Sequence, residues 1–561
     1  MRMLNEKNKR ENQNRTGEDR RKNKTETAAG LNTPELKDRR WTDRFSYFCT
    51  VFSMIVLFVI MIYLSFASFL ETTDMNMNNS MLENVEYHKD NFIFNLVMLV
   101  LFSFIVFVYS RLIKRVDVRI IISACIFAVL VMGLVWTFSS LSAPTHDSLI
   151  VSRAAYKASL GDYSDIDSDY FKRFPFQLGY VFFSEIIIRL FNTGDNYLVI
   201  EVINVICLAV SYLAVLMSVR IMFGSEKTVK ICALLMVFCF PAILFCTFTY
   251  GNIPGLMFAS LAVWQYLGVK GKSLKSDILH GVLCALFIGI SVSIKKNYMI
   301  VMAAILIIAV VRAIERKRFL HLACALLCVV SVWGCSAAVV RLYESRAGCE
   351  FGDGIPMISW LAMGLNESEI APGWYNGKYT VTNFHENGMD TELAAEDSVK
   401  EIKERLEFFR EDKTYAGDFF GEKIISQWNE PTYQSIWTNQ VRGRYGDMGK
   451  IASWVCGDGE AKVKGFMDLY MQFVYAMTAC AALLIIKKRD IVSALFGVVI
   501  IGGFLYHTLF EAKSQYAISY FILMIPLAAY ALDYACGKAD GLFKAVKEAW
   551  NAKKIKNKAR G

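Results

Sequence analysis

The chain has 561 residues, of which 55% are hydrophobic, and its mean hydropathy is +0.34. That is too apolar for a soluble protein of this length, and runs of about 18–25 apolar residues recur, each long enough to cross a bilayer core. The formal net charge of +9 is concentrated in the polar ends, where residues 1–45 carry 13 Lys/Arg against 8 Asp/Glu and residues 537–561 carry 8 against 2. Basic ends of this kind favour cytosolic flanks of membrane helices over a nucleic-acid partner. We therefore expect an all-α polytopic membrane protein with no nucleic-acid partner.

Apolar runs along the chain predict twelve transmembrane helices. The predicted spans are 46–70, 92–112, 119–141, 197–221, 228–250, 253–270, 278–294, 299–314, 319–342, 465–486, 490–509 and 516–535. A further run at 176–191 is short for a span and contains Glu185 and Arg189. If this run does not cross, the short Lys/Arg-rich loops and both basic ends all lie in the cytosol, as the positive-inside rule requires. We therefore expect 176–191 to be an interfacial or re-entrant helix.

This topology divides the chain into membrane and polar parts. The predicted parts are a cytosolic basic tail (1–45), two N-terminal spans (46–118), a transmembrane core (119–342) with a first external loop (142–196), an external polar insert (343–464), the C-terminal spans (465–536) and a second cytosolic basic tail (537–561). Apolar residues at helical spacing predict one helix around 399–409 and a second at 419–428. Cys349 and Cys456 lie in the insert and could form a disulfide in an oxidising compartment. The other cysteines lie in or beside apolar runs, where they act as small hydrophobes.

Ionisable side chains within membrane spans are costly and commonly mark function. In the predicted topology these residues share one depth, at the outer ends of their spans: Asp147, Glu201, Lys295, Lys296, His507 and Glu511, with Lys513 just beyond. The two consecutive lysines lie outside, against the charge bias that the other loops obey. The common depth predicts a single site at the outer leaflet.

Each of these residues also has a structural interpretation. Asp147 could be the N-cap of an interfacial helix, where its carboxylate would accept backbone N–H groups, and this role is compatible with catalysis. Lys295 and Lys296 could extend along apolar surface to reach the membrane interface. His507 alone could be a satisfied polar residue between helices.

Several segments, taken in order, carry a resemblance to a known class of enzymes. Asp147 follows a membrane span within THDS, and RFPFQLGYVFFSEIIIRLF (173–191) forms a proline-aromatic turn into an apolar helix. VRIMFGSEK (219–227) and FTYGNIPGLMF (248–258) follow, and HTLFEAKSQY (507–516) comes late in the chain. Over 119–535 the chain resembles the GT-C class of integral-membrane glycosyltransferases, closest to bacterial relatives of the dolichyl-phosphate-mannose protein mannosyltransferases and the lipid A aminoarabinose transferases. It departs at Gln515, where arginine is usual, and Lys513 is the candidate replacement for that charge.

The resemblance implies a GT-C-like bundle of about 12 transmembrane helices with interfacial helices and an external insert, in which the spans before residue 119 are an addition. It implies inverting transfer of a hexosyl or pentosyl group from a polyprenyl-phosphate-linked donor to a hydroxyl of an extracytoplasmic glycan, lipid or protein. The implied site residues are Asp147 as general base, Lys295, Lys296 and Lys513 at the donor phosphate, and His146, Arg173, His507, Glu511 and Tyr516 around the substrates. No cofactor is expected, with a divalent metal ion as the one alternative. The enzyme would be multi-pass in the cell membrane, with its active site facing outside.

Elementary chemistry agrees with these implied roles. A lipid-linked donor keeps its phosphate at headgroup level, so cations must lie there. The departing phosphate needs electrostatic stabilisation, and the acceptor hydroxyl needs a general base.

Two other function classes make different predictions. A transporter or flippase of lipid-linked glycans would show inverted repeats and paired broken helices near the membrane midplane. A scaffold protein would show no clustering of ionisable residues at one depth. The sequence contains no GxxxxGK[ST], GxSxG or HExxH motif, which argues against an ATP-driven pump and the common hydrolase designs.

Overall fold

The computed structural model describes residues 34–77, 83–194, 197–271 and 273–558, so most of the N-terminal tail predicted at 1–45 lies outside the described residues. Within the described ranges, ten helices are long and apolar enough to cross a membrane. They are α2 (Pro34–Leu70), α3 (Phe92–Leu112), α4 (Val118–Ser140), α8 (Tyr197–Phe223), α12 (Leu274–Ile294), α13 (Met299–Arg316), α14 (Leu320–Ala347), α21 (Glu460–Lys488), α22 (Leu495–Leu509) and α23 (Ser514–Lys558). The prediction of a polytopic helical membrane protein is confirmed.

The two remaining predicted spans are present in altered form. The run 228–250 is broken into α9 (Glu226–Val237) and α10 (Phe240–Leu244), which with the following turn is bent by 56° and counts as an eleventh span if it is one unit. The run 253–270 is α11 (Asn252–Gly268), whose 17 residues lie at the short end of the range for crossing a bilayer.

The ambiguous run 176–191 forms α7 (Leu178–Phe191), a helix of 14 residues that packs against α5 (His146–Ser159), α12 and α14. At about 1.5 Å per residue it is too short to cross the hydrocarbon core, which agrees with an interfacial helix. Its two charged residues pair with each other, because Arg189 Nε lies 2.8 Å from Glu185 Oε1. Glu185 is buried and accepts a hydrogen bond from the Tyr343 hydroxyl at 2.6 Å. It also forms an ion pair with Arg346, at 3.2 Å.

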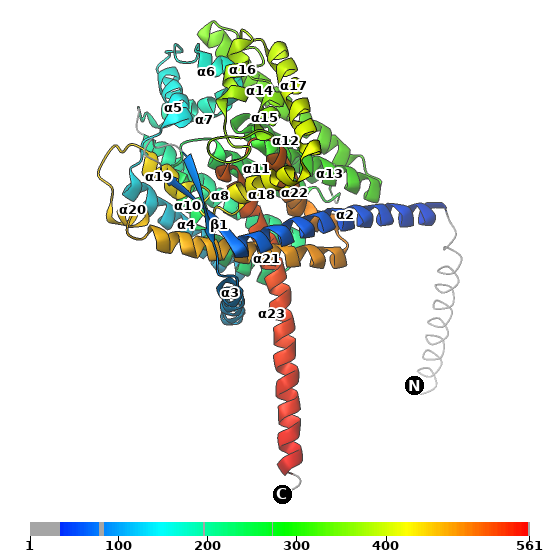
Figure 1. Cartoon of the computed structure of the whole chain (residues 1–561). Coiled ribbons are helices and arrows are strands. Elements are labelled where there is room, and N and C mark those ends of the chain that lie inside the picture. The colour runs from blue at the N-terminus through cyan, green and yellow to red at the C-terminus, as the bar shows by residue number, and fades with distance from the viewer. Residues whose placement is uncertain (1–33, 78–82, 195–196, 272, 559–561) are drawn as a thin grey trace.

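One part of the fold was not predicted from the sequence. Between α2 and α3 the chain forms an antiparallel hairpin of β1 (Glu71–Met77) and β2 (Glu83–Lys89). The hairpin is held by the insert, because Thr73 N–H donates to the Asn429 carbonyl at 3.0 Å and the Asn429 side chain donates to the Glu71 carbonyl at 2.9 Å. The first N-terminal span, α2, is packed into the bundle, where it lies against α21, α13 and α22 (Figure 1).

The insert contains six α-helices of 6 to 21 residues, and both helices predicted in it are confirmed. They are α15 (Met357–Gly364), α16 (Val381–Glu386), α17 (Thr391–Glu411), α18 (Lys413–Trp428), α19 (Ser435–Val441) and α20 (Lys450–Val455). The buried amine of Lys423 on α18 donates to the carbonyls of Gly364 and, at 2.8 Å, Phe510, which ties the insert to the turn between α22 and α23. Cys349 and Cys456 are both free thiols and pack in different apolar clusters.

The sidedness of the bundle remains a prediction from charge and is open to direct labelling. We expect a cysteine replacing Lys114, in the loop between α3 and α4, to react only after the membrane is permeabilised, because that loop is basic. A cysteine replacing Lys378, in the insert, should react with an impermeant maleimide in intact cells. Both positions are exposed, so neither result depends on burial. External labelling at residue 114 would contradict the topology.

Candidate functional site

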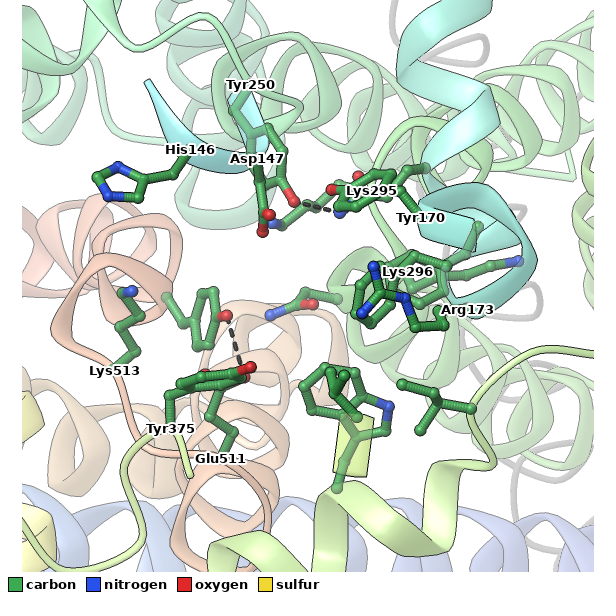
Figure 2. Close-up of a pocket in the computed structure, with 18 of the residues that line it drawn as sticks. His146, Asp147, Tyr170, Arg173, Tyr250, Lys295, Lys296, Tyr375, Glu511 and Lys513 are labelled. Atoms are coloured by element: carbon green, nitrogen blue, oxygen red, sulfur yellow. Dashed lines mark hydrogen bonds between the residues drawn. The ribbon is translucent and has the colours of Figure 1, made fainter. Parts of the chain in front are cut away.

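A large cavity lies where the insert meets the ends of the membrane helices. Its volume is about 1730 Å³. All nine residues that the sequence predicted for the site line it: His146, Asp147, Arg173, Lys295, Lys296, His507, Glu511, Lys513 and Tyr516. Figure 2 labels seven of them, all except His507 and Tyr516. They come from segments spread over some 370 positions of the chain, and the fold brings them to one space.

Asp147 lies in the first turn of α5 and is exposed to the cavity. The N-cap of this helix is Thr145, and the cap is closed by Ser148, whose hydroxyl accepts from Thr145 N–H at 3.1 Å and donates to the Thr145 carbonyl at 2.7 Å. The alternative that Asp147 caps the helix is therefore wrong. His146 has φ +49°, a left-handed conformation that costs roughly 1–2 kcal/mol for a residue with a Cβ. In Figure 2 the Asp147 carboxylate points toward the centre of the cavity and the His146 ring points away from it.

Two buried tyrosines flank the Asp147 carboxylate. Burial raises the pKa of Tyr170 and of Tyr250, and the nearby Asp147 charge raises both further. Both phenols thus stay protonated across the physiological range and can donate hydrogen bonds. The Tyr250 hydroxyl is held by the Gln177 amide. Neither tyrosine was singled out from the sequence, although Tyr250 lies in the FTYGNIP turn that carried part of the resemblance.

The consecutive lysines point to different parts of the cavity. Lys295 is extended, with φ −148° and ψ 112°, and its Nζ lies 4.2 Å from the centre of the Tyr250 ring and 5.4 Å from that of Tyr516. Burial lowers the Lys295 pKa to about 8, and the Glu511 and Asp147 carboxylates partly oppose that shift. Lys296 starts a 3₁₀ turn and donates to Ser336 Oγ on α14 at 3.2 Å. Lys295 is thus the lysine placed between the two carboxylates.

The turn between α22 and α23 contributes a carboxyl and an amine. Burial raises the pKa of Glu511 to about 7, against the opposing effects of Lys513 and of the Tyr516 hydroxyl, which donates to Glu511 at 3.1 Å. Burial lowers the pKa of Lys513, but the Glu83 and Glu511 carboxylates more than offset this and its pKa is raised. The Lys513 amine lies 2.5 Å from Glu83 on β2. Glu83 itself lines the cavity and was missed by the sequence analysis.

Two predicted residues take supporting positions at the wall. His507 is 1% exposed, stacks on the Tyr516 ring at 5.4 Å, and has Nδ1 3.3 Å from the Glu511 carbonyl. These contacts agree with the interpretation of His507 as a polar residue packed between helices, and its side chain also forms part of the cavity wall. Arg173 donates to the Asp169 carbonyl at 3.1 Å and lies at the rim beside Phe174.

Glu201 was placed with the cluster from its depth, but it does not line the cavity. It is fully buried in α8, where Ser142 Oγ and the Tyr445 hydroxyl each lie 3.4 Å from its carboxylate. Arg442 and Arg444 are near enough to act on this carboxyl group electrostatically. Arg442 does line the cavity, donates to the Thr247 carbonyl and lies 4.5 Å from the Phe248 ring centre. No local pattern marks Arg442, because it interacts with Glu201, which lies far away in the chain.

Comparisons with known proteins give a family and a weak similarity to a solved structure. A family model described as "conserved hypothetical integral membrane protein" matches residues 47–417. The comparison with curated proteins gives no match. Among solved structures, the chain is similar to the archaeal oligosaccharyltransferase AglB from Archaeoglobus fulgidus, in complex with an inhibitory peptide and a dolichol-phosphate. That similarity has 13% identity and a TM-score of 0.38, and covers 76% of this chain and 52% of the other, so the chain spans about half the length of that structure. A TM-score this low establishes neither a shared fold nor a shared activity.

Proposed function

The chain belongs to the family of conserved hypothetical integral membrane proteins, and we propose that it is a membrane glycosyltransferase. Its donor is a sugar linked to a polyprenyl phosphate, and its acceptor is a hydroxyl group on a glycan, lipid or protein outside the cytosol. The observation that supports this most is the meeting of one exposed carboxylate, Asp147, with the amines of Lys295 and Lys513 in a single large cavity.

The proposed reaction is a single displacement at the anomeric carbon. Asp147 takes the proton from the acceptor hydroxyl as the new C–O bond forms on one face of the sugar. The bond between the anomeric carbon and the phosphate oxygen breaks on the opposite face, which inverts the configuration. The phosphate leaves with the bonding electrons, and Lys295 and Lys513 stabilise its charge. The tyrosine hydroxyls near Asp147 can hold sugar hydroxyls in place.

The lining of the cavity supports two different substrates. Met299 and Trp333 are exposed apolar side chains from the membrane helices α13 and α14, and this side suits the prenyl chain. Trp360, Tyr375 and Asn376 come from the insert, and their rings and amide suit the acceptor. The donor would approach from the membrane and the acceptor from water.

Reconstitution with both substrates tests this function. Protein in lipid nanodiscs receives polyprenyl-phosphate sugars and envelope glycans extracted from a strain that lacks the protein. We expect free polyprenyl phosphate and an extended glycan in equal amounts. A deletion strain should accumulate the lipid-linked donor and lose one sugar from a surface glycan. The proposal would be contradicted if the protein transferred sugar from none of the lipid-linked donors that accumulate in the deletion strain.

A flippase of lipid-linked glycans is the second candidate, because the bent pair α9–α10 is a broken helix of the kind transporters use. Its break at Phe238 does not border the cavity among the described residues, which favours the transferase. In the nanodisc experiment a flippase would form no new glycosidic bond.

The proposed donor site should bind its anionic substrate more weakly at alkaline pH. The donor phosphodiester keeps one negative charge throughout the range, whereas Glu511 loses its proton near pH 7 and Lys295 near pH 8. Both proton losses make the cavity more negative as the pH rises, so the KM for the donor should increase from pH 6 to 9. Above the pKa of Lys295, the KM should rise about tenfold for each pH unit. In Glu511→Gln the inflection near pH 7 should disappear. A flat KM in the wild-type protein would contradict these assignments.

A further inference from the structure

Three cysteines from two membrane helices converge away from the cavity. Cys284 lies near the middle of α12, and Cys324 and Cys328 lie one turn apart on α14. Their three sulfur atoms all lie within 4.8 Å of one another, and the Cys284 and Cys328 sulfurs are 3.7 Å apart. The three side chains are at most 4% exposed.

This spacing is the one that a shared metal ion requires. Zn–S bonds of about 2.3 Å at tetrahedral angles place sulfur atoms about 3.8 Å apart. Buried cysteines commonly act only as small hydrophobes, which is how the sequence interprets these three. That interpretation accounts for the burial of the three cysteines, but it does not explain why three sulfur atoms from two helices lie close together.

A buried histidine next to the thiols points independently to a ligand. His321 precedes Cys324 by three residues and Cys328 by seven, so all three share one face of α14. It is 1% exposed, and its Nδ1 has no hydrogen-bond partner among the residues that the structure describes. A buried imidazole nitrogen without a hydrogen-bond partner is costly unless it has a ligand.

The surroundings can also balance the charge of a metal thiolate. Arg312 on α13 is 5% exposed, its Nε lacks a hydrogen-bond partner within the described ranges, and it acts electrostatically on His321. Three thiolates leave a net charge of −1 with Zn²⁺ and −2 with Cu⁺. A nearby guanidinium reduces the cost of that charge in an apolar environment.

We propose that Cys284, Cys324 and Cys328 bind a soft d¹⁰ cation, Zn²⁺ or Cu⁺. Each thiol loses its proton as its bond to the metal forms, and the metal does not change its oxidation state. Three thiolates suffice for Cu⁺, whereas Zn²⁺ takes a fourth ligand, for which His321 is the candidate. The bound ion cross-links α12 to α14. Because α12 ends at Ile294, the link fixes the helix that carries Lys295 into the cavity. The site does not depend on the proposed glycosyltransferase function.

Metal analysis of the purified full chain tests the proposal. Wild-type protein, purified in detergent and passed through a chelator, should retain about one Zn or Cu per chain by plasma mass spectrometry. The variant with Cys284, Cys324 and Cys328 all replaced by Ser should retain none. The matched control replaces Cys232, Cys239 and Cys246, which are equally buried but outside the cluster, and should keep the metal.

Spectroscopy separates the two ions and guards against a misfolded variant. If the ion is Zn²⁺, Co²⁺ substitution in wild-type protein should produce thiolate charge-transfer bands, and His321→Ala should alter the d–d bands. If it is Cu⁺, His321→Ala should leave the copper content unchanged. The proposal is overturned if wild-type protein contains no metal as purified and retains none after incubation with Zn²⁺ or Cu⁺ and removal of the excess ion by a chelator. That result needs no variant, so poor folding of the triple mutant cannot obscure it.

Discussion

Asp147→Asn should lose nearly all glycosyl transfer while the protein remains folded. The substitution keeps the shape of the side chain and removes the group that accepts the acceptor proton, and loss of a general base costs about 10²–10⁴-fold in rate. Because Thr145 and Ser148 close the cap of α5, helix stability should change little. The measurement is kcat at saturating donor, together with the thermal unfolding midpoint.

A matched control separates the base from the cap. Ser148→Ala removes the two hydrogen bonds between the Ser148 hydroxyl and the Thr145 backbone, each worth about 0.5–1.5 kcal/mol of stability, while it leaves the Asp147 carboxylate in the cavity. We therefore expect Asp147→Asn to be stable and inactive, and Ser148→Ala to be less stable and active. If Asp147→Asn transfers sugar within a few-fold of the wild-type rate, Glu511 becomes the next candidate for the base.

Lys295→Ala should be the most damaging of the cavity lysine substitutions. Its amine lies near two carboxylates and over two tyrosine rings, where it can donate a charge-assisted hydrogen bond to a bound phosphate. A hydrogen bond to a charged group is worth about 1.5–3 kcal/mol, which corresponds to about a 10–150-fold loss in kcat/KM for the donor. The kinetic constants for the donor, measured at fixed acceptor, test this.

The neighbouring lysine provides the comparison. Lys296 already donates to Ser336 and points toward α14, so Lys296→Ala should affect kcat/KM much less. Equal losses in the two variants would show that both amines contact the donor. No loss in either would restrict them to anchoring the helix ends at the membrane interface.

Much of the membrane architecture follows from local properties of the chain. A span needs only about 20 apolar residues, so length and hydropathy locate most of the helices without any knowledge of packing. The charge bias of the loops excluded α7 from the spans, and its 14 residues agree. The same reasoning placed the ionisable residues at one depth, and the cavity that collects Asp147, Lys295 and Glu511 is consistent with that prediction.

The features that the sequence could not supply depend on contacts between distant segments. Glu201 is buried near Arg442, whereas Glu511 borders the cavity. Their similar predicted depth cannot distinguish them, because the difference depends on which distant segments pack around each side chain. The hairpin before α3 has no strong strand pattern of its own and is held by Asn429 of the insert. Asp147 met every local criterion for an N-cap, and only the geometry assigns that role to Thr145.

The hairpin also has a consequence for how the protein is made. Glu83 is held by Gln434, which lies 351 positions later in the chain, and by Lys513, which is later still. At a synthesis rate of about 5–20 residues per second, Glu83 leaves the ribosome about 20–70 s before Gln434 is made. During that interval the hairpin lacks these partners, and the cavity cannot close until translation is nearly complete. Shortening the chain from its C-terminus should therefore leave membrane-inserted proteins without an intact cavity, and the last spans decide when the cavity is complete.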